Sequence, residues 1–240
     1  EERASYRAGR AIVVDLRGNG GGFRSASDEL AGAIFGPEAE RRSQTIYVQA
    51  SWVTRISDDN VSLIMHRTTA MADGPQSEGG SRPNAQRTGW IYRGALRNGQ
   101  DALVLGSPPS PTAGGLTRRR AGRPPPPAAD GARIFVLVNE TCLSACLWFL
   151  DVAAAMPGTT IIGGPSGSDG PLTWVRSVAL PDGGVILNVP MMEVRGFARS
   201  PGEFYTPDIA YPGLWEDEAV RAWVLGLIDA ERPLPAPASP

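Results

Sequence analysis

A strand, a loop and a helix follow one another twice in this sequence, and this repeated unit restricts the fold more than any other feature. The first unit has a β-branched apolar run at 11–16, a glycine-rich loop at 17–22 and a helical pattern at 25–36. The second has an apolar strand at 133–138 and a helical pattern at 144–156. Strands that alternate with helices in this way predict an α/β fold with a largely parallel central sheet.

Further elements follow the second unit. The sequence predicts a third buried strand at 159–162, a hairpin with strands at 172–180 and 185–189, and an amphipathic helix at 215–229. In the first helix, Ser25 and Asp28 have the spacing of a capping box. These elements extend the α/β pattern to the end of the chain.

The segment between the two units has a different pattern. Apolar and polar residues alternate at Ile46–Ala50 and Trp90–Tyr92, which predicts several short strands within an irregular insert at 41–131. Proline and glycine clusters at 107–131 predict an exposed, partly disordered loop, and 233–240 has the composition of a disordered tail.

Composition excludes several classes of function. The chain has 23 basic residues, all of them arginine, and a net charge of -2, so lysine chemistry is excluded. Its one basic run, Arg118–Arg120, lies in a Pro/Gly-rich stretch, and we expect no nucleic-acid partner. The longest apolar stretches are well short of the roughly 20 residues that span a bilayer. One histidine and two close cysteines argue against a zinc site, and we expect no metal and no cofactor.

The glycine-rich loop 17–22 has two explanations. Closely spaced glycines let backbone N–H groups approach an anion or a developing oxyanion, because no Cβ atom blocks them. A phosphate site is disfavoured, since the loop lacks the Gly-Lys-Ser/Thr ending and Phe23 stands where a dinucleotide fingerprint needs its third glycine. A tight turn that needs positive φ is the structural alternative.

The second loop leads into Ser144 at the start of the predicted helix. A serine at a strand-to-helix junction has an exposed hydroxyl, and the N–H of the next residue lies at the positive end of a helix. Taken alone, the pattern favours an ordinary helix N-cap. Cys142 and Cys146 flank this serine, either as buried thiols, which we favour, or as a local disulfide.

Together the two loops resemble tail-specific (C-terminal processing) and tricorn-type serine peptidases. Residues 15–22 match their Asp-x-Arg-x-Asn-x-Gly-Gly signature, and Ser144-Ala145 resembles their nucleophile segment. Residues 161–164 and 202–210 resemble two further family segments, so that the match covers most of 11–230 outside the insert. The resemblance implies a ClpP/crotonase-like superhelix of strand-strand-helix units, with a peptidase catalytic domain over 1–232.

The resemblance also implies roles for site residues. Ser144 would be the nucleophile, and the N–H groups of Gly21, Gly22 and Ala145 would form the oxyanion hole. Asp15 and Arg17 would hold the loop in shape.

The general base is not evident. The bacterial branch of the family uses a lysine, whose place here is taken by Asp169, and arginine cannot replace it because it stays protonated. The tricorn branch uses an upstream histidine that a serine and a glutamate orient, and Glu203 falls near that glutamate. His66 follows the first motif, the wrong place for such a base, and we expect it on a strand surface. We therefore expect the base in a segment upstream of residue 1.

These inferences predict a serine endopeptidase that acts on protein or peptide substrates. A non-catalytic homologue that binds an apolar ligand or a peptide, as in the retinoid-binding relatives, is one alternative, and an esterase-like acyl hydrolase is another. The family's habit implies an extracytoplasmic location, and the sequence gives no oligomeric state.

Overall fold

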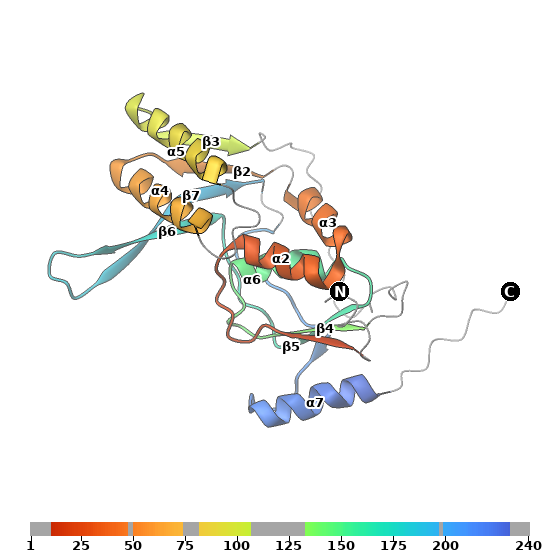
Figure 1. Cartoon of the computed structure of the whole chain (residues 1–240). Coiled ribbons are helices and arrows are strands. Elements are labelled where there is room, and N and C mark those ends of the chain that lie inside the picture. Colours follow the sequence, from red (N-terminus) through yellow and green to blue (C-terminus); the bar gives the residue numbers. More distant parts are fainter. Residues whose placement is uncertain (1–10, 48–49, 74–81, 107–132, 197–198, 231–240) are drawn as a thin grey trace. The chain divides into compact units, whose positions relative to one another are not determined.

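The computed structural model describes residues 11–47, 50–73, 82–106, 133–196 and 199–230. The chain divides into two compact units (Figure 1). The first unit is made of residues 1–46, 115–169 and 201–240, and the second of residues 47–114 and 170–200. The predicted loop at 107–131 and the predicted tail at 233–240 lie outside the described residues, as do residues 1–10.

The first unit contains a parallel sheet of four strands in the order β1-β4-β5-β8. These strands are β1 (Ile12–Asp15), β4 (Ile134–Val138), β5 (Thr159–Gly163) and β8 (Ile209–Ala210). Asp15 is in register with Leu137, and Leu137 with Ile162, so the carboxyl ends of β1, β4 and β5 meet at one edge of the sheet. The three strands predicted at 11–16, 133–138 and 159–162 and their parallel arrangement are confirmed.

Helices cover both faces of this sheet. Helices α2 (Arg24–Phe35) and α6 (Ala145–Ala153) pack with Val136 and its neighbours on one face. Helix α7 (Asp217–Asp229) packs through Val220 and Val224 against Phe135 and Leu137 on the other. Strand β4 is therefore buried on both faces, which explains its uninterrupted apolar sequence.

The start of α2 differs from the prediction. Phe23 occupies the N-cap position without a side-chain cap, and Ser25 lies inside the first turn. Asp28 instead accepts a hydrogen bond from the Ser43 hydroxyl and forms an ion pair with Arg24. The predicted capping box is wrong because its acidic member is engaged by another helix, α3 (Pro37–Tyr47).

The second unit contains an antiparallel sheet in the order β3-β2-β7-β6. Its strands are β2 (Ser51–Arg55), β3 (Ala102–Gly106), β6 (Leu172–Ala179) and β7 (Ile186–Arg195). Helices α4 (Asp58–Asp73) and α5 (Arg82–Arg97) lie against this sheet (Figure 1), and side chains such as Ile64, Tyr92 and Met192 form a shared core. The hairpin predicted around 181–184 is confirmed as β6 and β7.

Two predicted strands in the insert are wrong. Ile46 and Tyr47 are the last two residues of helix α3, residues 48–49 lie outside the described residues, and Trp90–Tyr92 lies within helix α5. Tyr92 and Ala95, three residues apart, are both buried on one side of α5, whereas Trp90 is exposed. Alternation over three residues was too short to separate a strand from a helix, and the helical spacing over the longer window decides.

None of the helices in the described part of the chain is long and apolar enough to cross a membrane.

Candidate active site

The two loops singled out in the sequence meet at the carboxyl ends of β1 and β4. The N–H of Gly18 donates to Thr141 Oγ1 at 2.8 Å, and the N–H of Leu143 donates to the Asn19 carbonyl at 3.2 Å. The side chain of Asn139 accepts both the N–H and the hydroxyl of Thr141. Parallel pairing of β1 with β4 brings the loops to the same edge, and these bonds fix one against the other.

At Gly21 the glycine-rich loop lies in close contact with the segment that carries Ser144. A Cβ atom on Gly21 would lie 2.7 Å from the Ser144 Cβ, 2.8 Å from the Leu143 carbonyl oxygen and 3.1 Å from the Ala145 nitrogen. Its φ of 103° also favours glycine. The glycine is therefore required by contact with the Ser144 segment as well as by the turn itself.

Ser144 has a strained backbone and a free hydroxyl. Its φ is 52° and its ψ is -117°, and among the described residues other than glycine only Trp174 shares a positive φ. Such a conformation costs about 1–3 kcal/mol and persists only where the surroundings impose it. Ser144 occupies the N-cap position of α6, but its side chain makes no capping bond, and within the described residues its hydroxyl has no hydrogen-bond partner. The N-cap explanation therefore does not account for this serine.

Backbone donors surround the serine. Ala145 is the first residue of α6, and within the described part of the chain neither its N–H nor that of Gly22 has an acceptor. The N–H of Gly21 is donated to Asn19 Oδ1 at 2.9 Å. The carbonyl of Ala145 accepts the Ser27 hydroxyl at 2.6 Å, which ties the start of α6 to α2. The oxyanion roles of Gly21, Gly22 and Ala145 stay predictions.

Asp15 and Arg17 brace the glycine-rich loop. The Arg17 guanidinium bonds both carboxylate oxygens of Asp15 and reaches Asp217 at the start of α7 at 3.0 Å. Burial raises the pKa of Asp15, but the hydrogen bonds and positive charge of Arg17 outweigh it and hold that pKa below its ordinary value. The hydrogen bonds that Arg17 donates to Asp15 raise the pKa of Arg17. Both groups are thus charged at neutral pH, and the expected shaping role agrees with these contacts.

Asp169, at the position where the bacterial branch of the family has its lysine, lies on a segment beside the Ser144 loop. A Cβ atom on Gly167 would clash with the Leu143 side chain and come 2.6 Å from the Glu140 carbonyl oxygen. Two residues on, the Asp169 carbonyl accepts the N–H of Gly202 at 2.9 Å. The segment that carries Glu203 therefore runs along the segment that carries Asp169.

A buried hydrogen-bonded chain anchors these two segments. Ser166 Oγ accepts the N–H of Tyr205 and donates to the Gly167 carbonyl, each at 2.8 Å. The Tyr205 hydroxyl donates to Asp151 of helix α6 at 2.7 Å. Asp151 is 1% exposed, so this bond satisfies part of a carboxylate that water does not reach.

His66 lies elsewhere in the chain. It is exposed on helix α4 of the second unit, so the expectation of a strand position is wrong. The helix forms because residues 58–73 bury Val61 and Ile64 on one side, a spacing of three residues.

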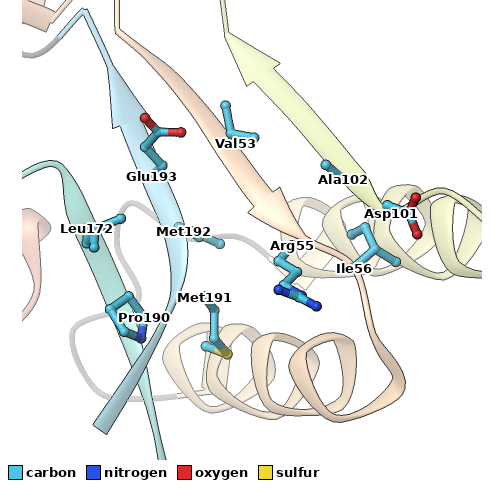
Figure 2. Close-up of a pocket in the computed structure, with 10 residues that line it drawn as sticks. All are labelled: Val53, Arg55, Ile56, Asp101, Ala102, Leu172, Pro190, Met191, Met192 and Glu193. Atoms are coloured by element: carbon cyan, nitrogen blue, oxygen red, sulfur yellow. The ribbon is translucent and has the colours of Figure 1, made fainter.

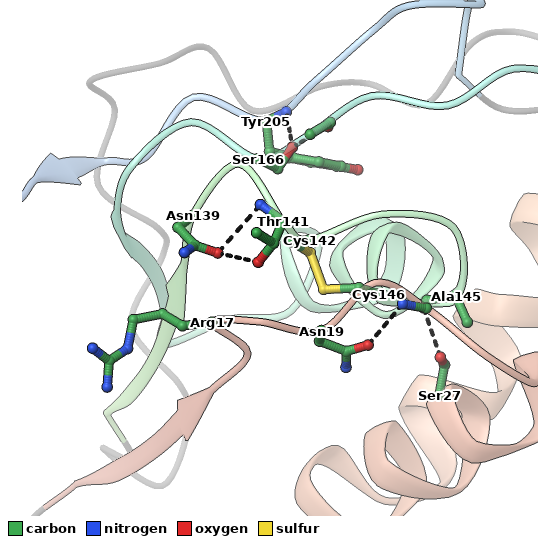
Figure 3. The surroundings of a disulfide bond; sticks show 12 residues. Arg17, Asn19, Ser27, Asn139, Thr141, Cys142, Ala145, Cys146, Ser166 and Tyr205 are labelled. Atoms are coloured by element: carbon green, nitrogen blue, oxygen red, sulfur yellow. Dashed lines mark hydrogen bonds between the residues drawn. A yellow bond between two sulfur atoms is a disulfide. The ribbon is translucent and has the colours of Figure 1, made fainter. Parts of the chain in front are cut away.

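Cys142 and Cys146 form a disulfide with a Cα–Cα distance of 5.3 Å (Figure 3). The preference for buried thiols is therefore wrong. Both residues are buried in the core that α2 and α6 share, as expected, but the first turn of α6 brings them close enough to bond. Ser144 lies at the centre of the five-residue ring that this bond closes.

Four supporting residues were not identified from the sequence as site residues. Figure 3 shows Asn19, Ser27, Asn139 and Thr141 around the start of α6. The position of Asn19 in the Asp-x-Arg-x-Asn motif was a signal for one of them. The other three act through contacts between segments more than a hundred residues apart or through a local turn, which the sequence alone does not display.

The second unit contains an open hollow of about 400 Å³ (Figure 2). Its lining combines apolar side chains with Arg55, Asp101 and Glu193. The apolar lining residues are Val53, Ile56, Ala102, Leu172, Pro190, Met191 and Met192. Within the described residues, no group of three or more His, Cys, Asp or Glu side chains is placed to hold a metal ion.

Several solved structures are similar to this chain. A peptidase from Parabacteroides merdae, described as putative, is 18% identical with a TM-score of 0.42, and the match covers 95% of this chain and 55% of that one. A photosystem II D1 C-terminal processing protease is 16% identical with a TM-score of 0.35, covering 87% of this chain and 36% of that one. Mature CPAF in complex with lactacystin is 15% identical with a TM-score of 0.46, covering 93% and 44%.

The chain thus spans between about a third and just over half of the length of these proteins. No curated protein matches the sequence. The model of peptidase family S41 matches residues 3–195, which is most of the chain. This protein belongs to peptidase family S41.

Proposed function

We propose that this chain is the catalytic domain of a serine endopeptidase that cleaves peptide bonds through an acyl-enzyme on Ser144. The observation that carries the proposal is Ser144 itself: a serine in a strained conformation at a strand-to-helix junction, with a free hydroxyl and a glycine loop packed against it. Strained residues of this kind concentrate at sites where a side chain must be presented to a substrate. Membership of a peptidase family supplies the substrate class.

In the proposed reaction, Ser144 Oγ attacks the scissile carbonyl carbon, and the carbonyl oxygen becomes an oxyanion. The free N–H groups of Ala145 and Gly22 are the donors for that oxygen, and Gly21 makes room for it. Removing one such donor typically costs about 3 kcal/mol of transition-state stabilisation. The base that took the Ser144 proton returns it to the nitrogen, which leaves as an amine, and water then hydrolyses the ester on Ser144 to restore the enzyme.

The proton of the Ser144 hydroxyl needs an acceptor. Lysine is absent and arginine stays protonated, so neither takes that role. We propose an imidazole other than His66 for this role, with Glu203 orienting the ring. The pairing of the Glu203 segment with the Asp169 segment, which lies next to Leu143, supports the proposed role of Glu203.

Two further features belong to the proposal. The repeated strand and helix units of the first unit support the ClpP/crotonase-like superhelix as its fold. The buried disulfide supports a location outside the cytoplasm, because disulfides persist in oxidising compartments. The expected partner is a protein or peptide substrate.

A fluorophosphonate probe tests the proposal on the full-length protein. We expect stoichiometric labelling of wild type, mapped to Ser144 by mass spectrometry, and none of the Ser144→Ala variant. Ser62→Ala, an exposed serine on α4, is the matched control and should label as wild type does. Absence of labelling in folded full-length protein would overturn the serine peptidase proposal.

The hollow in the second unit favours one alternative, a non-catalytic homologue that binds a peptide or an apolar ligand. Its mixed apolar and charged lining is typical of ligand sites. Retained binding of an apolar peptide by a protein that no probe labels would favour this alternative.

A further inference from the structure

The disulfide that encloses Ser144 has a second consequence for the site. Cys142 lies two residues before Ser144 and Cys146 two residues after it, and the bond joins them directly. Neither cysteine is exposed by more than 2%. The bond therefore fixes both ends of the segment that carries the nucleophile.

The ψ angle of Ser144 is the part of the conformation that we expect to change if the disulfide is broken. Rotation about ψ turns the peptide group between Ser144 and Ala145, and with it the Ala145 N–H. At ψ of -117° this N–H has no hydrogen-bond partner among the described residues, and it lies near the place where a Gly21 Cβ would be. A change in ψ would aim this N–H away from the oxyanion position, although Ser144 itself would remain.

The hydrogen bonds at the start of α6 do not by themselves require this angle. The N–H of Cys146 bonds the Leu143 carbonyl and the N–H of Trp148 bonds the Ser144 carbonyl, as in an ordinary helix start. An ordinary helix start does not need a positive φ at its N-cap, which typically lies in the β region. A short covalent ring restricts the alternatives, because it keeps Cys142 and Cys146 within bonding distance.

We infer that the Cys142–Cys146 disulfide is a positioning element of the Ser144 site, and that the acylation rate of Ser144 depends on whether this bond is oxidised. The inference rests on the proposed serine peptidase function. The two cysteines act through Ser144 and the Ala145 N–H, and they do not touch the substrate. Reduction by a phosphine breaks the S–S bond, gives two thiols and converts the phosphine to its oxide, with water supplying the oxygen and the protons.

The experiment compares three forms of the full-length protein: oxidised wild type, phosphine-reduced wild type and the Cys142→Ala/Cys146→Ala variant. Reduction is verified by the mass gain of two hydrogen atoms. The readouts are the rate of fluorophosphonate labelling and, on a small ester substrate, kcat and KM separately. We expect the labelling rate and kcat to fall by about tenfold or more in both disulfide-free forms, with KM nearly unchanged, since an oxyanion donor is misplaced.

Val152→Ala is the matched control, because Val152 is buried in the same core and on the same helix but leaves the disulfide intact. We expect this variant to have a lower thermal midpoint, because the loss of core packing reduces stability. Its labelling rate should stay within about twofold of the wild-type rate. The double variant should not respond to phosphine. If the double variant does not fold, reduced wild type, which keeps the packing volume of both sulfurs, supplies the measurement.

Equal labelling rates for oxidised and reduced wild type would overturn the inference alone. A Val152→Ala rate as slow as that of the double variant would also overturn it, because the effect would then follow stability. Failure of oxidised wild type to label would overturn the proposed function, and this inference with it.

Discussion

Gly21 and Ser144 are in such close contact that a Cβ atom on the glycine would lie 2.7 Å from the Cβ of the serine. Real Cβ atoms essentially never approach so closely, and the Leu143 carbonyl oxygen, 2.8 Å from the same point, belongs to backbone, which moves aside less easily than a flexible side chain. The contact is within the first unit, and it joins the ends of β1 and β4 at the candidate site.

Gly21→Ala should therefore displace the nucleophile loop. We expect fluorophosphonate labelling to slow on the order of a hundredfold, as when an oxyanion donor is lost. Gly20→Ala is the matched control, because a Cβ atom there meets nothing within 4 Å and its φ is not positive. Slowing by Gly20→Ala to the same degree would show that the loop tolerates no side chain, whatever its contacts.

Asn19 should act through the turn that it closes on the Gly21 N–H. Asn19→Ala removes this acceptor, and we expect kcat/KM to fall about fivefold, the equivalent of about 1 kcal/mol for one hydrogen bond. Asn19→Asp keeps an acceptor oxygen at the same place and should retain most of the activity. Steady-state kinetics on a peptide substrate measure both, and equal losses in the two variants would contradict the role of the turn.

The Asp15–Arg17 pair should contribute stability that depends on pH. Because the pKa of Asp15 is lowered in the folded state, its contribution is fully present above the unfolded pKa of about 3.9 and is lost as pH falls through the folded value. Urea unfolding of wild type and Asp15→Asn should thus differ at neutral pH and converge in strong acid. A difference that stays constant down to that range would contradict the ion pair as its source.

Tyr205 should stabilise the first unit through Asp151. Tyr205→Phe takes one hydrogen bond from a buried carboxylate, and we expect the free energy of unfolding to fall by about 1–3 kcal/mol. Tyr211→Phe is the control, because the Tyr211 hydroxyl bonds the Leu214 carbonyl in an exposed position, where we expect a change within about 0.5 kcal/mol. Chemical denaturation measures both, and equal effects would argue against the buried bond.

Glu203→Gln tests the proposed orientation of the base. Glutamine keeps the shape of the side chain but loses its charge, so we expect kcat to fall by about tenfold or more while KM changes little. The pH profile of kcat should also shift, because a carboxylate beside an imidazole favours its protonated form. An unchanged profile would leave Glu203 with a structural role only.

Long apolar runs made the parallel sheet predictable. The uninterrupted apolar sequence of β4 predicts a buried strand, and the structure has one there. The helical spacing of Val220 and Val224 predicts a helix, which is α7. Among the described residues, Ile46, Tyr47 and 90–92 are helical and not strands, because short alternating stretches fit a helix as well. At 90–92, burial of Tyr92 and Ala95 in the core of the second unit favours the helix.

The residues of the candidate site were predictable from the sequence, but the hydrogen bonds that join them were not. The motifs named the glycine loop and Ser144, but the bond from Gly18 to Thr141 joins residues 123 positions apart and depends on the sheet register. The disulfide was not predictable because two cysteines four apart at a helix start are compatible with either redox state.

The pairing of β1 with β4 also orders events during synthesis. Among the described residues, β4 is the one strand that pairs with β1, and the segment between them supplies most of the second unit. The glycine loop thus leaves the ribosome well before the strand, the disulfide and the helix that complete the site. A nascent chain that ends between β1 and β4 therefore contains the glycine loop without Ser144.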